Sequence, residues 1–339
     1  MSIKNKDIAK ILNISPAAVS LARNGKAGVS DHTRKMVRDL LQEMEVQNGR
    51  PADMDMKGSI VFVIHKKHGK IITETPFFLS LTEEIQRRAL ARGYHVTILQ
   101  YYGGDDIGDF IKRIVEIHAL GVLLLATELD SDDLKVYREI GLPIVLIDSN
   151  FMDQKLDAVT INNIDAVYEI VNYAKQCGHQ EIGFLKSKVE NNNFYERYLG
   201  FQAALDRMKL AFHPEYVFEV GVSSDYAYID MKQILQEKCK LPTVLIAGND
   251  MLAIGALRAL KEAGIKVPED VSIIGFDDMP VSRMMDPPLT SIRIYNDLIG
   301  ECAINRLIEK METGGTGHFT TRVGCDLMIR DSVKTIRQL

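Results

Sequence analysis

PTVLIAGNDMLAIGALRALKEAGIKVPEDVSIIGFDDMP, residues 242–280, joins two short apolar runs through one longer amphipathic segment. The runs at 243–247 and 271–274 have the length and composition of buried strands. Between them, apolar residues recur at helical spacing from 250 to 263, and Gly264 is suited to the position that ends a helix. The stretch predicts a strand, a helix and a second strand parallel to the first.

The same alternation extends outward over most of the chain and restarts once, after Thr160. The predicted strands are 60–64, 96–99, 121–125, 144–147, 182–185, 217–220, 243–247 and 271–274. The predicted helices are 78–92, 106–118, 131–140, 164–177, 194–209, 225–238 and 250–263. Apolar strands separated by helices are typical of parallel sheets that are covered on both faces. We therefore predict two doubly wound α/β lobes, with a ligand cleft at the carboxyl ends of their strands.

Length and composition limit the class of protein. A chain of 339 residues is long enough for two or three domains, and 46% hydrophobic and 26% charged residues are typical of a soluble globular protein. No apolar run approaches the ~20 residues that span a bilayer, and the N-terminus lacks the apolar core of a secretory signal. We expect a cytoplasmic protein with no membrane partner. We predict free or buried thiols, without disulfide or metal spacing, at Cys177, Cys239, Cys302 and Cys325.

Charge is distributed unevenly along the chain, whose net charge is −5. Residues 1–50 hold nine Lys or Arg and five Asp or Glu, a balance of +4, while the remainder holds 32 and 41, a balance of −9. A small basic head is thus joined to a large acidic body. Because binding of a polyanion needs only a local cationic face, the head is a candidate for contact with nucleic acid.

Three short helices are predicted in the head from the helical spacing of its apolar residues. Ser15 followed by Pro16 is a favourable start for the second helix, and Asn24-Gly25 is a favourable end. Ser30 can cap the third helix. Two short helices joined by a tight turn near a basic N-terminus describe a helix-turn-helix.

The residues of the head and the body also resemble a known family. Lys4–Val37, KNKDIAKILNISPAAVSLARNGKAGVSDHTRKMV, is similar to the DNA-binding head of the LacI/GalR family of transcriptional regulators. The shared pattern is Asp7-Ile8-Ala9, Ser15-x-x-x-Val19-Ser20, Asn24-Gly25 and Val29-Ser30-x-x-Thr33-Arg34. The body resembles the periplasmic-binding-protein-like effector domain of that family in residues 242–280, Thr75-Pro76-Phe77-Phe78, Pro143 to Asp148, Cys177-Gly178-His179, Glu196-Arg197-x-x-Gly200-Phe201 and Pro287 to Arg293.

The resemblance implies a division of the chain into four parts. A small all-α helix-turn-helix head, residues 1–45, precedes a linker, 46–58. Because such bodies cross between their lobes three times, we expect an N-terminal lobe of 59–161 and 291–322, and a C-terminal lobe of 162–290 and 323–339. The linker VQNGRPADMDMKG departs from the hinge-helix segment of the family, so we favour a flexible linker. The alternative is a hinge in which Met54 or Met56 is an apolar wedge in the minor groove.

By the same resemblance, the second helix of the head reads DNA. Pro16, Ala17 and Leu21 occupy the positions that face base edges, and all three are apolar. Sequence readout would then depend on thymine methyl groups, on Ser20 or on DNA shape. Basic residues are interpreted as phosphate contacts, and the alternative is a solvated basic bundle. The full predicted DNA-binding set is Lys6, Ser15, Pro16, Ala17, Ser20, Leu21, Arg23, Asn24, Lys26 and Arg34.

An effector site is predicted from residue chemistry and from the resemblance together. A polyhydroxylated ligand requires carboxylates that accept hydrogen bonds, Arg and Asn side chains that donate them, and an aromatic wall. Residues of these types, at positions that match family ligand positions, are Phe77, Phe78, Asp148, Asn193, Arg197, Asn249 and Asp277. For Arg197 and Asp277 the alternative is a salt bridge across the cleft, and for the two phenylalanines it is core packing. Asn162-Asn163 stands where family sites commonly have Asp-Asn.

The loop HKKHGK, residues 65–70, follows the first predicted strand of the body, at the expected mouth of the cleft. Its charge would favour an anionic ligand such as a sugar phosphate, but we favour the alternative of a solvated surface loop. His65 and His68 lack a third metal ligand within reach in the sequence, so we expect no metal site.

Known catalytic motifs are missing from the sequence, which has no G-x-S-x-G, P-loop, H-E-x-x-H or G-x-G-x-x-G after its first strand. We therefore expect no catalytic residue and no cofactor. We predict a homodimeric, ligand-responsive regulator that binds a palindromic operator in double-stranded DNA. Its function would be to repress genes for the use of its effector, a sugar or a related small polar metabolite. The alternative is a sugar-binding receptor domain with weak or vestigial DNA binding.

Overall fold

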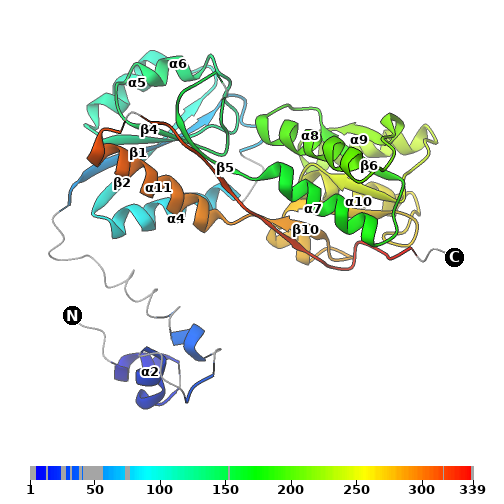
Figure 1. Cartoon of the computed structure of the whole chain (residues 1–339), viewed down its shortest axis with the longest axis horizontal. Coiled ribbons are helices and arrows are strands. Elements are labelled where there is room, and N and C mark those ends of the chain that lie inside the picture. The colour runs from blue at the N-terminus through cyan, green and yellow to red at the C-terminus, as the bar shows by residue number, and fades with distance from the viewer. Residues whose placement is uncertain are drawn as a thin grey trace. The chain divides into compact units, whose positions relative to one another are not determined.

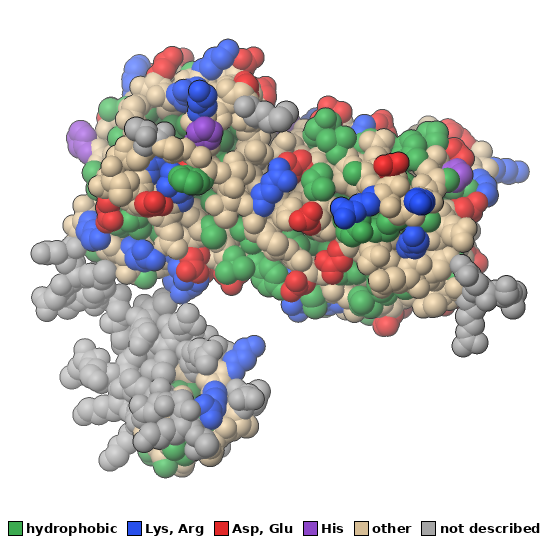
Figure 2. All heavy atoms as spheres, in the orientation of Figure 1, with side chains coloured by type: hydrophobic (Ala, Val, Ile, Leu, Met, Phe, Trp, Pro, Cys, Tyr) green, Lys and Arg blue, Asp and Glu red, His purple; other side chains and the backbone are tan. Residues whose placement is uncertain are grey.

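The computed structural model describes residues 5–12, 14–23, 28–30, 33–37, 40, 56–72, 77–151, 153–315 and 317–336. The chain divides into two compact units, a head of residues 1–56 and a body of residues 57–339 (Figure 1). On the face of the body seen in Figure 2, acidic and basic side chains lie interspersed. No helix in the described ranges combines the length and the apolar character that a membrane-spanning segment requires.

The head contains the two helices of the predicted helix-turn-helix, α1 (Asn5–Ile11) and α2 (Pro16–Arg23), and residues 33–37 are also helical. Ser15 caps α2, because its Oγ accepts a hydrogen bond of 3.1 Å from the Ala18 N–H. The buried core of the head is formed by Ile8, Ala9, Val19 and Val37. Ile8 of α1 and Val19 of α2 thus pack with Val37 of the helical residues 33–37.

The N-terminal lobe is built on a six-stranded parallel sheet in the order β11-β5-β4-β3-β1-β2. Its strands are β1 (Gly58–Lys66), β2 (Tyr94–Tyr102), β3 (Gly121–Leu125), β4 (Ile144–Ile147), β5 (Asp157–Ile161) and β11 (Thr320–Val323). Helices cover both faces, which explains why β3, β4 and β5 are buried along their whole length. One face holds α4 (Phe77–Ala91) and α11 (Asn296–Thr313), and the other holds α5 (Ile107–Glu116) and α6 (Leu134–Arg138).

The C-terminal lobe repeats this plan with the sheet order β12-β10-β9-β8-β6-β7. Its strands are β6 (Ile182–Ser187), β7 (Val217–Val220), β8 (Val244–Ala247), β9 (Ser272–Asp277), β10 (Thr290–Arg293) and β12 (Asp326–Met328), and only β12 is antiparallel to its neighbour. One face is covered by α7 (Asn163–Gln176) and α8 (Asn192–Arg207), the other by α9 (Ser224–Gln236) and α10 (Asp250–Glu262). Two short 3₁₀ helices, η1 (Pro214–Tyr216) and η2 (Pro280–Arg283), complete the lobe.

The predicted fold class is confirmed: two doubly wound lobes form the body. In each sheet the strand order reverses beside the first strand of the lobe, between β1 and β3 and between β6 and β8. At such a reversal the connections leave toward opposite faces, so the carboxyl edge of the sheet is open between them.

The chain crosses between the lobes three times, after β5, after β10 and after β11. Figure 1 shows the last crossing as the long red segment. The predicted boundary at residue 291 is wrong, because residues 290–293 form β10 and pair with β9 in the C-terminal lobe. Likewise Val323 pairs with Ile161 in the N-terminal lobe. Both runs are β-branched, and their backbone groups are satisfied by pairing before the chain leaves the sheet.

Asp157, the first residue of β5, holds three segments of the N-terminal lobe together. Its Oδ1 accepts hydrogen bonds from Arg306 Nε at 2.6 Å and from the Phe319 N–H at 2.9 Å, and its Oδ2 pairs with Lys310 Nζ. Burial of this carboxyl raises its pKa, but the two cations outweigh burial, so the pKa lies below its ordinary value. The carboxylate thus fixes α11 and the approach to β11 against the sheet.

We expect Asp157→Asn to lower the free energy of unfolding by about 3 kcal/mol at pH 7, because it leaves Arg306 partly buried without its counter-charge. The lowered pKa means that the charge stabilises the folded state above the ordinary pKa of Asp. That contribution is lost as pH falls through the folded-state pKa of Asp157, so the difference between variant and wild type should shrink in acid. Urea unfolding at several pH values measures both effects.

The matched control is Asp109→Asn, which removes the same charge from an exposed pair with Lys112. It should leave the unfolding midpoint unchanged. An equal loss of stability in the two variants would show that Asp157 acts only through the overall charge of the protein.

Candidate functional site

A small cavity lies where the carboxyl ends of strands from the two lobes meet. Its volume is about 30 Å³, and β3, β4, β8 and β9 end beside it. Six of the seven side chains predicted for the effector site line it: Phe78, Asp148, Asn193, Arg197, Asn249 and Asp277. Phe77 begins α4, but its side chain lies outside the described residues. The sequence therefore placed these polar groups at one site from their positions after strands.

Arg197 is at the centre of the polar side of the cavity, although its side chain is almost fully buried. Its Nε donates to Asn163 Oδ1 at 2.9 Å and its Nη1 donates to the Gly248 carbonyl at 2.7 Å. The guanidinium carbon lies 3.7 Å from the centre of the Phe276 ring, in a cation–π contact. These contacts fix the plane of the guanidinium before any ligand arrives.

Asp277 is the last residue of β9 and lies 3.4 Å from Arg197, measured from Oδ1 to Nη1. The salt bridge predicted as the alternative for these two residues is present, but it does not cross the cleft, because both residues belong to the C-terminal lobe. Burial raises the pKa of Asp277 to about 7, despite the nearby guanidinium. Its φ of 111° is a strained conformation for a residue with a side chain, which is typical of functional positions.

Asp148, directly after β4, is the acidic group that the N-terminal lobe contributes. Thr127 Oγ1 donates to its Oδ2 at 2.5 Å, whereas its buried Oδ1 accepts no hydrogen bond from the described residues. Burial raises the pKa of Asp148, against the effect of Thr127, Asn193 and Arg197. Its φ is 74°. An unsatisfied buried acceptor beside a cavity is costly unless a ligand or a water donates to it.

The amide residues near Arg197 form a connected network. Asn163, which stands where the family pair Asp-Asn also has Asn, is buried and donates through Nδ2 to Asn193 Oδ1 at 2.8 Å and to Glu196 Oε2 at 2.9 Å. Asn249 caps α10, because its Oδ1 accepts from the Leu252 N–H at 3.0 Å. The Asn163 amide thus orients both Arg197 and Asn193.

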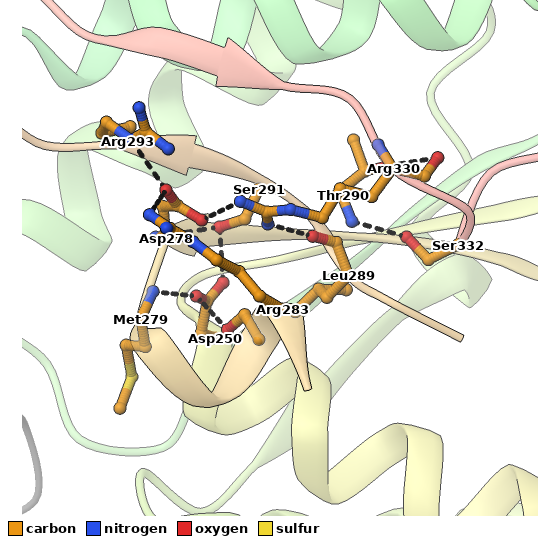
Figure 3. Close-up of polar contacts among 11 residues, drawn as sticks. Asp250, Asp278, Met279, Arg283, Leu289, Thr290, Ser291, Arg293, Arg330 and Ser332 are labelled. Carbon is orange, nitrogen blue, oxygen red and sulfur yellow. Dashed lines mark hydrogen bonds and ion pairs between the residues drawn. The ribbon is translucent and has the colours of Figure 1, made fainter. Parts of the chain in front are cut away.

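A second network lies behind Asp277 and holds the turn that follows β9 (Figure 3). Asp278 is buried, and it pairs with Arg283 at 3.1 Å, with Arg293 at 2.8 Å and with Arg330. Burial would raise the pKa of Asp278, but the three arginines lower it below its ordinary value. Three guanidinium groups from separate segments therefore converge on the residue next to Asp277.

Asp250 supports the same turn from α10. It accepts from the Met279 N–H at 2.8 Å, from Ser282 Oγ at 2.6 Å and from Ser291 Oγ at 2.6 Å (Figure 3). Burial raises the pKa of Asp250 to about 6. Asp250 and Asp278 each follow a residue of the cavity, so both carboxyls position the site from behind.

Six lining residues were not predicted: Ile71, Thr127, Ile161, Asn191, Phe194 and Ile294. Thr127 comes two residues after β3, so the rule that identified Asp148 would also have found it. Phe78 lines the cavity and also belongs to the buried hydrophobic core, so both interpretations of that residue apply. No group of three or more His, Cys, Asp or Glu in the described part of the chain is arranged to hold a metal, and all four cysteines are free thiols.

The predicted DNA-binding residues are only partly described. Ser15, Pro16 and Ala17 are exposed at the start of α2, and Ser20, Leu21 and Arg34 are half-buried. The side chains of Lys6 and Arg23, and the residues Asn24 and Lys26, lie outside the described residues, as does most of the linker 46–58. The start of α2 is therefore exposed in the described part of the head.

Comparisons with known proteins found similar sequences and similar folds. Residues 171–333 match the family model of the periplasmic binding protein-like domain. The HTH-type transcriptional repressor PurR of Histophilus somni (strain 129Pt) is 29% identical over 335 residues, which cover 98% of this chain and 99% of that protein.

Solved structures share the fold over nearly the full length. A complex of the transcriptional regulator CelR with cellobiose has a TM-score of 0.73 at 22% identity, covering 98% of this chain and 100% of that one. The lac repressor dimer bound to operator and the anti-inducer ONPF has a TM-score of 0.72 at 21% identity, with the same coverage. The chain is therefore similar over nearly its full length to an HTH-type transcriptional repressor, and it has the fold of the solved regulators CelR and the lac repressor.

Proposed function

We propose that this regulator is a homodimeric repressor that binds a palindromic operator through its head and a small polar effector in the cavity of its body. A single observation carries the effector part. Asp148 and Asp277, at the ends of strands from the two lobes, lie with the buried Arg197 of α8 around one cavity, and Asp148 Oδ1 is unsatisfied among the described residues. Buried charges arranged in this way are typical of a site that exchanges its internal contacts for those of a ligand.

The chemistry of the cavity favours a sugar or a similar polyhydroxylated ring. Asp148 and Asp277 can accept from hydroxyl groups, Arg197 can donate, and Phe78 and Phe194 supply apolar walls. The cavity of about 30 Å³ is smaller than such a ligand, so the lobes have to separate before it enters. The effector would then stabilise one separation of the lobes, and this preference would alter operator affinity.

The head supports the DNA-binding part of the proposal. Its two helices place the exposed Pro16 and Ala17 at the start of α2, the end of a recognition helix that contacts bases in helix-turn-helix proteins. One such unit reads a half-site, so a two-fold dimer on a palindrome is the expected assembly. A receptor that only binds sugars would have no use for this head.

Selection of bound sequences from a random duplex library, with the full-length protein at moderate salt, tests the DNA-binding part. We expect a palindrome whose half-sites carry thymine at the positions facing Pro16 and Ala17. Arg34→Ala is the control, and it should weaken binding to all sequences alike, because a phosphate contact carries no sequence information. Absence of enrichment, with and without a panel of sugars and nucleosides, would contradict the proposal.

We expect Arg197→Ala to weaken effector binding roughly 100-fold or more while operator binding is retained, because a charged donor of two hydrogen bonds is removed from the site. Isothermal titration with the sugar that stabilises the wild type measures the first effect, and operator gel shifts measure the second. Arg258→Ala, at an exposed arginine of the same lobe, is the matched control. Loss of both activities in Arg197→Ala would assign it a structural function.

Effector affinity should depend on pH around neutrality. Burial raises the pKa of Asp277 to about 7, so its carboxyl is protonated below that pH and charged above it. A ligand hydroxyl donates to the charged form, so affinity should fall by up to about tenfold per pH unit below 7 and level off above it. Asp277→Asn should remove this dependence between pH 6.5 and 8. A wild type with flat affinity over that range would exclude Asp277 as the acceptor.

A further inference from the structure

The loop of residues 67–72, between β1 and α4, is not accounted for by the proposed function. Two side chains of this loop lie close to carboxylates of the same lobe. Lys67 Nζ is paired with Asp130 at 2.5 Å and with Asp133 at 2.9 Å, and His68 Nδ1 lies 3.3 Å from Glu128. Lys67 and His68, two of the side chains that suggested an anionic ligand, thus already face carboxylates of residues that follow β3.

Glu128 holds the backbone of this loop. Its side chain is fully buried, and its Oε2 accepts from the N–H groups of His68 at 3.1 Å and Gly69 at 2.8 Å. Its Oε1 accepts from the N–H groups of Ile71 at 2.9 Å and Ile72 at 3.2 Å. One carboxylate therefore satisfies four main-chain donors in five consecutive residues, which fixes the path of the loop.

The negative charge of Glu128 also favours its hydrogen bonds to the loop backbone. Burial raises the pKa of the Glu128 carboxyl, but the hydrogen bonds from Ile71, His68, Gly69 and Ile72 outweigh burial, and the pKa lies below its ordinary value. The carboxylate is charged at neutral pH, and a charged acceptor forms stronger hydrogen bonds than a neutral one.

The loop delivers one apolar side chain to the other lobe. Ile71 is buried, lines the effector cavity and packs in a small hydrophobic cluster with Phe194 and Val222. Both partners belong to the C-terminal lobe, Phe194 at the start of α8 and Val222 just after β7. Ile71 is thus an N-terminal-lobe residue that closes the cavity against the opposite lobe.

We propose that Glu128 is a positioning residue of the effector site, which holds residues 68–72 so that Ile71 forms the cavity wall against Phe194 and Val222. The proposal deepens the effector site described above and rests on it for the identity of the cavity. Glu128 itself does not line the cavity. It acts through the loop, and Ile71 limits the size of ligand that fits when the lobes are together.

Glu128→Gln tests the proposal without a large change of shape. The amide keeps one acceptor oxygen, but its NH₂ group faces two N–H donors in place of the other oxygen, so two of the four hydrogen bonds are lost. Asp130→Asn is the matched control. It removes the same charge two residues away, from a carboxylate with no hydrogen bond to the backbone of residues 68–72 among those described.

The first readout is cleavage of the full-length protein by trypsin at the Lys70–Ile71 bond, with no added compound. The N–H of that bond donates to Glu128, so cleavage requires the loop to open. We expect cleavage of Glu128→Gln at this bond to be roughly tenfold or more faster than that of the wild type, and Asp130→Asn to behave as the wild type. Equal rates for all three proteins would overturn the proposal.

The second readout is hydrogen–deuterium exchange at the start of α8, in the opposite lobe. Glu128→Gln and Ile71→Ala should each raise exchange in the segment that contains Phe194 several-fold, because the first displaces and the second truncates the Ile71 side chain that packs on it. Faster trypsin cleavage with unchanged exchange at α8 would show that Glu128 tethers the loop without positioning Ile71, and would also overturn the proposal.

Neither readout uses an effector, so the two proposals fail separately. If no sugar or nucleoside of the panel raises the melting temperature of the wild type, the proposed effector class is wrong. Where a compound does raise it, Glu128→Gln and Ile71→Ala should reduce that shift, whereas Asp130→Asn should not. A full shift in both variants would mean that the loop is no part of the ligand site.

Discussion

The arrangement of elements around the cavity depends on one buried guanidinium, that of Arg197, and on the groups that contact it. Arg197 cannot be hydrated, so its charge has to be matched by groups brought to it from several elements. Asn163 at the start of α7, the Gly248 carbonyl after β8, Asp277 after β9 and the Phe276 ring supply that compensation. Each of these contacts requires a strand to end, or a helix to begin, at one place. The positions of α7, α8, β8 and β9 relative to one another are therefore coupled through one side chain.

The same site stores strain in its backbone. Asp148 and Asp277 both have φ in the left-handed region immediately after a strand, where a residue with a side chain is held only by its surroundings. Behind Asp277, the converging arginines on Asp278 and the hydroxyls on Asp250 supply that support. The polar network of Figure 3 is therefore part of the site, although none of the residues labelled there lines the cavity.

Much of the fold and of the cavity could be predicted because both follow from local rules. Apolar strands alternate with amphipathic helices, and the carboxyl ends of parallel strands meet, so residues after strands such as Asp148 and Asn249 were expected together. Contacts between distant segments gave no such signal. Glu128 binds backbone N–H groups that lie 56 to 60 positions earlier in the chain. Every residue type except proline has such a donor, so the residue types of the loop do not indicate this contact. β10 was misplaced because pairing with β9, and not its composition, decides its lobe.

The three crossings between the lobes have a consequence for synthesis of the protein on the ribosome. β11, the edge strand of the N-terminal sheet, ends at Val323, and α11 covers the face of that sheet. The first lobe to be translated therefore lacks a helix and a strand until almost the whole chain has emerged, whereas the head precedes them by more than two hundred residues. Until β11 has been synthesised, the edge of the N-terminal sheet beside β5 is unpaired. An unpaired sheet edge can pair with another chain. The order of these segments along the chain thus allows the head to fold before the N-terminal lobe of the body is complete.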